Sequence, residues 1–190
     1  MRQLIIIMGL FSFLTGCKDK PKKETVNVDG QSINTTTRTE DNYKYGLKDL
    51  TTEQTDFVNQ NLTIAKTIIL KYASDKGDKP FDSKTLDLVL EKWSSSTADK
   101  EKPEQIVDAI GAAFGQGIVD ELNCEWKIIT DQYGTDITVI HKKYVVNGFP
   151  FSSVLKVVTE DNSRSLNDIK LILKSQIETA EKTGEVDLRK

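Results

Sequence analysis

Apolar residues recur with a helical period along much of the chain. The first such segment predicts a helix over residues 52–73, opened by a capping box of Thr51 and Gln54. Asp82 or Ser83 caps a second, shorter helix, whose aliphatic residues and one tryptophan share a single stripe. The two apolar faces indicate that both helices pack against a common core.

Two further helices follow the same rules. Pro103, a residue suited to a first helical position, opens a helix that runs to about Asn123. Ser165 and Asp168 form a second capping box, and the apolar stripe behind them predicts a helix to about Lys182. Four helices are therefore expected from local signals alone.

Between these helices the pattern changes to that of strands. Residues 124–130 and 135–142 are rich in β-branched side chains, and residues 131–134, which end in glycine, suit a hairpin loop. Residues 144–146 predict a third short strand before residues 147–148 turn the chain. The central part of the chain therefore predicts a small antiparallel sheet.

The stretch after this sheet fits two structures. Residues 151–158 suit a short helix opened by Pro150, but the same residues also pass for a strand. The helices and the sheet together predict an α+β fold, with one globular domain over residues 45–190 in which helices pack on the sheet.

The amino-terminal residues have the pattern of a secretory signal. A short basic start precedes the apolar run 4–14, which is too short to cross a membrane as a stable helix. We therefore expect residues 1–16 to be a signal peptide that is removed from the mature protein.

The signal ends in Leu14-Thr15-Gly16-Cys17, which resembles the lipobox of bacterial lipoproteins. The resemblance implies cleavage between Gly16 and Cys17, with diacylglycerol on the Cys17 sulfur and a further acyl chain, such as palmitate, on the new amino terminus. Several acyl chains would hold the protein to a membrane far more firmly than one. The alternative is an ordinary secreted protein with an incidental cysteine.

Residues 17–44 contain few aliphatic side chains and predict a disordered tether between the lipid and the domain. Lys18 follows the cysteine where the enterobacterial rule for inner-membrane retention asks for aspartate. This difference favours the outer membrane, with the domain facing the periplasm or the exterior.

Composition and charge exclude several functions. The 26 basic and 29 acidic residues give a formal net charge of -3, which leaves no basic footprint for nucleic acid. Two cysteines and one histidine support neither a disulfide framework nor a zinc site. No cofactor and no metal are therefore expected.

The second half of the chain carries a resemblance to a known family. Gly111-Ala-Ala-Phe-Gly115, the segment from Trp126 to Gly134, and Phe149-Pro150 before an apolar helix are similar to the bacterial domain-of-unknown-function family 3806. The similar part covers residues 102–178, with a looser match at Lys156. The resemblance implies a compact fold and supplies no catalytic residues.

One pair of residues offers candidate chemistry. Cys124 and His141 stand at the two ends of the predicted hairpin. With Asp131 or Glu125 to orient the imidazole, they could serve as the nucleophile and the base of an acyl-transfer reaction. The same positions also suit a small buried hydrophobe and an edge imidazole. We favour the second interpretation and assign no catalytic residue.

Other motifs favour structural roles. Gly111, Gly115 and Gly117 lie inside a predicted helix, which favours close packing against a neighbour over a phosphate cradle. Residues 161–165 alternate oxygen ligands as a calcium loop does, but leucine and isoleucine stand where the loop needs glycine and glutamate.

The acidic pairs Asp120-Glu121 and Glu104/Asp108 are expected to form solvated helix faces. Tyr133 at the hairpin loop, Trp126 and His141 remain as candidate contact residues, with Trp126 favoured as a core residue.

The leading hypothesis is a lipid-anchored module of the cell envelope that binds an envelope protein or a wall component through one surface of its domain. A membrane-tethered hydrolase of envelope polymers or peptides is the first alternative. A toxin-blocking lipoprotein of the immunity type is the second.

Overall fold

The computed structural model describes residues 22–28, 31–37, 46–76, 79–131, 134–159 and 164–184. Helices and antiparallel strands together make up the domain, which confirms the α+β class. Along the chain the elements are β1 (Lys22–Val28), β2 (Gln31–Thr37), β3 (Gly46–Lys48), α1 (Thr52–Tyr72), η1 (Ser74–Lys76), α2 (Ser83–Ser95), α3 (Pro103–Glu121), β4 (Cys124–Asp131), β5 (Gly134–His141), β6 (Asn147–Gly148), α4 (Pro150–Thr159) and α5 (Leu166–Thr183).

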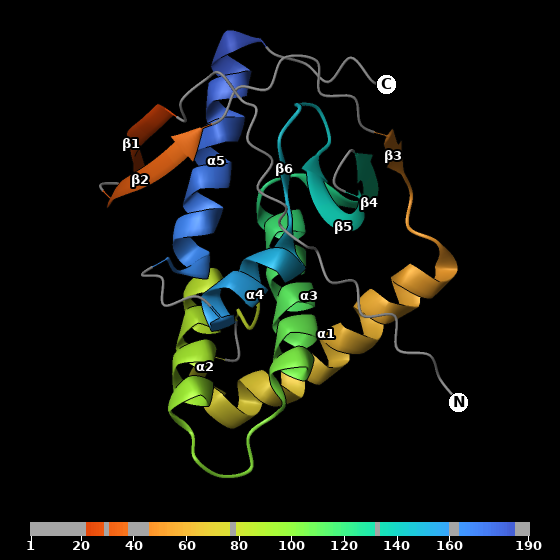
Figure 1. Cartoon of the computed structure of the whole chain (residues 1–190), viewed down its shortest axis with the longest axis vertical. Coiled ribbons are helices and arrows are strands. Elements are labelled where there is room, and N and C mark those ends of the chain that lie inside the picture. The colour runs from red at the N-terminus through yellow and green to blue at the C-terminus, as the bar shows by residue number, and fades with distance from the viewer. Residues whose placement is uncertain are drawn as a thin grey trace, which may run out of the picture.

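The main sheet has the strand order β3-β4-β5-β6, with antiparallel pairs throughout. Its centre is the predicted hairpin of β4 and β5, in which Cys124 stands opposite His141 and Ile128 opposite Ile137. The face of β4 that carries Cys124 and Trp126 packs toward the hydrophobic core. The sheet therefore closes one end of a helical layer (Figure 1).

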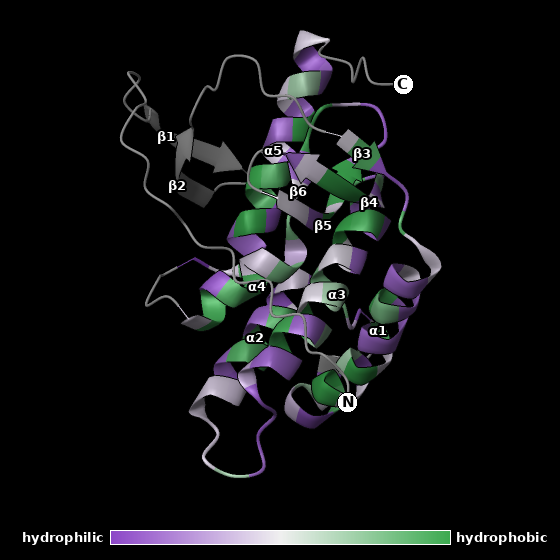
Figure 2. Cartoon of the chain, turned by 45° about the vertical axis from the view of Figure 1, so that its right-hand side comes forward, coloured by the Kyte–Doolittle hydropathy of each residue, from purple (hydrophilic) through white to green (hydrophobic). Residues whose placement is uncertain are grey.

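Helix α3 lies at the centre of the helical layer. Residues 109–115 are all buried, as expected for a helix that is apolar around its whole circumference. It packs against α1, α2 and α4, while α5 packs against α2 and α4 (Figure 1). Hydrophobic and hydrophilic residues alternate along α1 and α2, each of which buries a single face against the core (Figure 2).

The predicted helix starts are confirmed by their caps. The capping box of Thr51 and Gln54 opens α1, and Asp82 caps α2 by accepting hydrogen bonds from the backbone of the first turn. A second capping box, of Ser165 and Asp168, opens α5. Local chemistry therefore sets the start of these three helices.

The strand that follows the hairpin lies at a different place from the predicted one. Residues 144–146 form no strand, and the Asn147–Gly148 pair, which the sequence predicts as a turn, pairs with β5 as β6. The cause is His141, whose ring accepts a hydrogen bond from the backbone of Tyr144 and so bends the chain immediately after β5. Residues 151–158 adopt the helical alternative, as α4.

Three strands precede α1 that the polar pattern of the sequence does not predict. β1 and β2 pair from Lys22↔Thr37 to Val28↔Gln31 and lie against α5 (Figure 1). β3 extends the main sheet beyond β4. β-branched residues recur in both β1 and β2, and Asp29-Gly30 between them is a typical hairpin-turn sequence. The other residues of the predicted tether lie outside the described ranges.

Candidate binding groove

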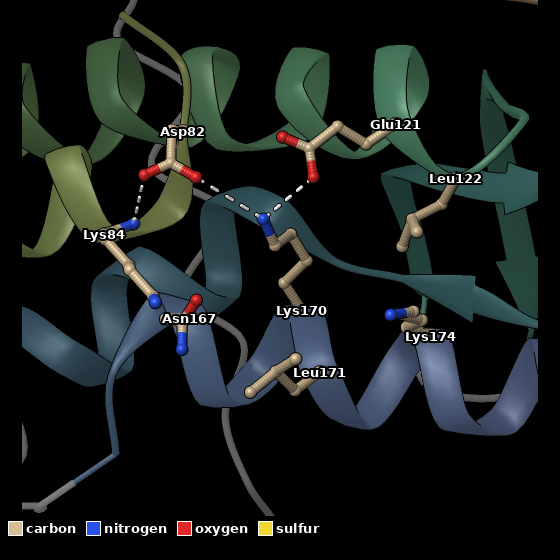
Figure 3. Close-up of a pocket in the computed structure, with 8 residues that line it drawn as sticks. All are labelled: Asp82, Lys84, Glu121, Leu122, Asn167, Lys170, Leu171 and Lys174. Atoms are coloured by element: carbon tan, nitrogen blue, oxygen red, sulfur yellow. Dashed lines mark hydrogen bonds and ion pairs between the residues drawn. The ribbon is translucent and has the colours of Figure 1, made fainter. Parts of the chain in front are cut away.

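An open groove lies where the start of α2, the end of α3 and the first turns of α5 meet (Figure 3). Its volume is about 570 Å³, which is within the range of small-ligand sites. The residues that line it are Asp82, Lys84, Glu121, Leu122, Asn167, Lys170, Leu171 and Lys174. They come from three helices that are far apart in sequence, so the groove exists only in the folded domain.

Lys170 occupies the middle of the groove and joins its two walls. Its Nζ lies 2.8 Å from a Glu121 carboxylate oxygen and 3.6 Å from Asp82 Oδ1. The other oxygen of Asp82 accepts hydrogen bonds from the first turn of α2. The Lys170 side chain is only 15% exposed. The Asp82 and Glu121 carboxylates, rather than solvent, therefore compensate its positive charge.

The α5 side of the groove is fixed to α2 by a buried polar contact. Asp87 accepts hydrogen bonds from the backbone N–H groups of Leu166 (2.7 Å) and Asn167 (3.0 Å), the first two residues of α5. The Asn167 side chain in turn accepts a hydrogen bond from the Ser83 hydroxyl at 3.1 Å. Burial raises the pKa of Asp87 above its ordinary value, although the two amide bonds oppose that rise.

Lys84 and Lys174 extend from opposite ends of the groove (Figure 3). Lys84 is exposed, and in the part of the chain that the structure describes its ammonium contacts no carboxylate. Lys174 lies 4.0 Å from Glu178, one turn further along α5. Leu122 and the buried Leu171 add apolar surface, so the groove combines two outer cations with an aliphatic floor.

The glycines of α3 serve close packing, as predicted. A Cβ atom on Gly111 would lie 2.5 Å from the Phe151 ring, and one on Gly115 would lie 2.8 Å from Pro150 and overlap the Trp126 ring. Gly117 faces the backbone of Phe81 in the same way. The residues that carry the family resemblance therefore meet on one face of α3 and lock β4 and α4 onto it.

Trp126, a candidate contact residue, is half-buried against this glycine face. Its Nε1 donates a hydrogen bond to Gln116 at 3.3 Å, and its ring centroid lies 6.0 Å from that of Phe151. Phe57 of α1 also packs against Phe151, with 5.7 Å between the ring centroids. The tryptophan therefore forms part of an aromatic cluster that holds three helices and the sheet together.

Cys124 and His141 lie opposite each other but lack the electrostatics of a nucleophile and its base. Burial raises the pKa of the Cys124 thiol to about 12, so the thiol stays protonated at neutral pH. His141 Nδ1 accepts hydrogen bonds from the backbone of Lys143 and Tyr144, at 3.2 and 3.0 Å. The imidazole also stacks on the Tyr144 ring, with 4.8 Å between the ring centroids. These contacts are those of a residue that holds the turn after β5.

Several predicted features lie outside the described ranges: the signal peptide of residues 1–16, the lipidation position Cys17 and Tyr133. Within those ranges no helix is long and apolar enough to span a bilayer. The same residues contain no group of three or more potential metal ligands. The described part of the chain thus offers the groove as its candidate site.

Sequence reasoning missed the residues of the groove. Glu121 entered only as half of an acidic pair on a helix face, and Lys170 carried no motif. The sequence separates Asp82 from Lys170 by most of the domain, and nothing in the local pattern shows that they meet. An apolar stripe interrupted by lysines on α5 is the one signal that could have drawn attention to this surface.

The fold and the groove define a small α+β domain with a surface site between helices. Residues 85–169 match the model of a family described as Domain of unknown function (DUF3806), which supports the resemblance found in the sequence and moves its boundaries toward the amino terminus. The match begins within α2 and ends in the first turn of α5, so it includes the glycine face of α3.

One solved structure, a crystal structure at 1.50 Å resolution from Bacteroides thetaiotaomicron VPI-5482, is similar to this chain. The TM-score is 0.52 at 12% sequence identity, and the similarity covers 84% of this chain and 70% of that chain. At this identity the likeness concerns the fold alone. No curated protein matches the sequence.

Proposed function

We propose that this protein is a lipid-anchored binding module of the bacterial cell envelope, and that the groove between α2, α3 and α5 is its binding site. The groove is the observation that carries the proposal. The Asp87 hydrogen bonds hold the start of α5 against α2 on one side of the groove. The Lys170–Glu121 ion pair holds its centre. Lys84, at one end of the groove, is exposed to solvent, where a partner can reach it.

The anchor rests on the sequence Leu14-Thr15-Gly16-Cys17 behind a short apolar run. A thioether-linked diacylglycerol on Cys17 would hold the domain at a membrane surface, facing the periplasm or the exterior. The lysine at position 18 favours the outer membrane. A binding module needs this placement, because its partner is an envelope protein or a wall component.

Binding is favoured over hydrolysis by the state of the Cys124 thiol, the candidate nucleophile. Burial raises the pKa of the Cys124 thiol to about 12, and Nδ1 of the imidazole opposite accepts hydrogen bonds from backbone amides, so the pair lacks the activated thiolate that a cysteine nucleophile needs. The groove itself holds two carboxylates, but both are engaged by Lys170. Neither set resembles a poised acid–base pair.

The anchor is tested by exchanging the two cysteines separately in the native host. We expect Cys17→Ser to release the full chain from membranes into the soluble fraction, whereas Cys124→Ala, the matched control, stays bound after an alkaline carbonate wash. Mass spectrometry should find acyl chains on the amino-terminal peptide of the control only. Retention of the Cys17→Ser protein on washed membranes would contradict the anchor.

The binding role is tested in intact cells with a photo-crosslinking amino acid. Placed at Leu171 in the groove, it should give a discrete crosslinked product with an envelope component. Placed at Lys66, an exposed position on α1, it should give none. Identical products at the two positions, or no product at Leu171, would count against the groove as the binding site.

A further inference from the structure

We infer that the domain meets the lipid bilayer at one end, which is formed by the β1–β2 hairpin, the carboxyl end of α5 and the loop of residues 142–146 after β5. This membrane-facing end is an interaction surface whose partner is the bilayer itself. The inference rests on the proposed lipid anchor at Cys17 and goes beyond it, because an anchor alone does not fix the orientation of the domain.

The short chain between the anchor and the first strand carries the inference. Four residues, 18–21, separate Cys17 from Lys22, the first residue of β1. An extended chain spans at most about 3.6 Å per residue, so the Cα atoms of Cys17 and Lys22 can be at most about 18 Å apart. A tether over the whole range 17–44, as the sequence predicts, would let the domain stand away from the bilayer in any orientation. The hairpin leaves only a small part of that length between the lipid and the folded chain.

The hairpin belongs to the folded domain, because both of its strands pack against α5. Each strand has seven residues, which correspond to about 23 Å, so Lys22 lies within about that distance of the helix. The two lengths together hold the α5 side of the domain close to the bilayer surface. The carboxyl ends of α1 and α2 lie at the opposite end of the domain and face away from it (Figure 1).

The loop after β5 lies beside the carboxyl end of α5. The Lys143 ammonium is within electrostatic range of the carboxylate of Glu181, in the last turn of that helix. Figure 1 shows both segments at the upper end of the domain. His141 holds the loop in place, since its Nδ1 accepts hydrogen bonds from the backbone of Lys143 and Tyr144.

This loop presents an aliphatic side chain to solvent. Val145 is 49% exposed, although its neighbours Tyr144 and Val146 are buried, and Lys143 beside them is exposed. An aliphatic group next to a lysine suits the headgroup region of a bilayer, where the apolar part leaves water and the ammonium group stays with the lipid phosphates.

A bilayer fits this end better than a protein partner does. One exposed valine offers far less apolar area than a stable protein interface needs. A bilayer that the anchor already holds at this distance is present at a high effective concentration, so a weak contact is enough to keep it occupied.

The test measures which end of the full lipidated chain touches the bilayer. A bimane fluorophore is attached to Val145→Cys or to the matched control Leu70→Cys, an exposed aliphatic position (62%) in the last turn of α1. Cys124 is buried and its pKa is raised to about 12, so a maleimide reacts with the introduced cysteine. The vesicles contain phosphatidylethanolamine and phosphatidylglycerol, with or without a nitroxide on the lipid headgroup.

We expect the nitroxide to lower the fluorescence at position 145 by about twofold and at position 70 by less than about a tenth. Circular dichroism of both labelled chains establishes that they are folded. Equal quenching at the two positions, or stronger quenching at position 70, would overturn the inference.

A longer connection tests its cause. A flexible Gly-Ser insert of about 20 residues between Lys20 and Pro21 adds a reach of about 25 Å. The insert should leave the chain on the vesicles in a flotation gradient but should remove most of the quenching at position 145. Unchanged quenching would overturn the inference, because the short connection would not set the orientation.

Failure of this inference and failure of the proposed anchor give different results. If the parent chain does not float with the vesicles, the anchor is absent and the proposed membrane placement is wrong. If the chain floats but position 145 is quenched no more than position 70, the anchor stands and the membrane-facing end is wrongly assigned.

Discussion

The middle of α3 and its carboxyl end meet the rest of the molecule in opposite ways. In the middle, Gly111 and Gly115 admit the rings of Phe151 and Trp126 into contact with the helix backbone. At the carboxyl end, Glu121 faces Lys170 across an open groove. The first contact is apolar and closely packed, and the second is charged and accessible to solvent.

The family match covers the packed face completely but the groove only in part, since Glu121, Leu122 and Asn167 are its lining residues within the match. The matched region contains the glycines, Trp126 and Pro150, all of which serve packing. Lys174, at one end of the groove, lies beyond the matched residues 85–169, and so do Asp82 and Lys84 at the other. The fold can therefore be shared among proteins whose grooves differ in charge.

The largest effect is expected from filling the glycine face. Gly115→Ala places a Cβ against both the Trp126 ring and Pro150, which cannot move without shifting β4 and α4. We expect the free energy of unfolding in urea to fall by about 2–3 kcal/mol. Gly46→Ala is the control, since nothing lies within 4 Å of the added atom, and it should change stability by less than about 1 kcal/mol. Equal stability of the two variants would contradict a packing role for Gly115.

The sequence predicts much of this packed region because its signals are local. Thr51, Asp82 and Ser165 each begin a helix through their own side chains, and the hairpin pattern of β4 and β5 depends on alternation within a few residues. The spacing of the helix glycines also indicates a close approach, although it does not name the ring that fills the space.

The groove could not be predicted in the same way. The Lys170 contacts with Asp82 and Glu121 depend on how three helices pack, and exposed lysines occur on most helices without a role. The position of β6 was missed for a related reason. A side-chain contact between His141 and the backbone of Tyr144 redirects the chain, and strand propensity does not contain it.

A smaller loss of stability is expected from a change at Asp87, which connects α2 to the start of α5 beside the groove. Asp87→Ala removes the acceptor of two backbone N–H groups at the start of α5 and leaves them without their partner. We expect a fall of about 1–3 kcal/mol in the free energy of unfolding. Amide hydrogen exchange should also accelerate in the first turn of α5 more than in α1. Unchanged exchange there would mean that Ser165 alone holds the helix start.

The titration of Asp87 gives a pH-dependent form of this comparison. Burial raises the pKa of its carboxyl in the folded chain above the ordinary value of 3.8, so the folded state binds more protons than the unfolded state between these two values. The contribution of Asp87 to stability is present below pH 3.8 and is lost as the pH rises through the folded pKa.

The isosteric variant Asp87→Asn isolates this contribution. Relative to the parent chain, its free energy of unfolding should improve as the pH rises from about 3.5 to about 6, since only the parent ionises a buried group. Urea unfolding at several pH values measures the difference between the two chains. A difference that moves in the opposite direction would show that the amide bonds outweigh burial and lower the pKa.

The smallest effect on stability is expected at the ends of the groove, and it sharpens the contrast with its centre. Lys170→Gln removes the cation between Asp82 and Glu121 and should cost about 1 kcal/mol, reduced in high salt because these carboxylates are partly exposed. Lys84→Gln and Lys174→Gln should each stay within about 0.5 kcal/mol of the parent chain. Urea unfolding at low and high salt measures all three. A loss at Lys84 or Lys174 as large as that at Lys170 would place the end lysines within the fold-stabilising network.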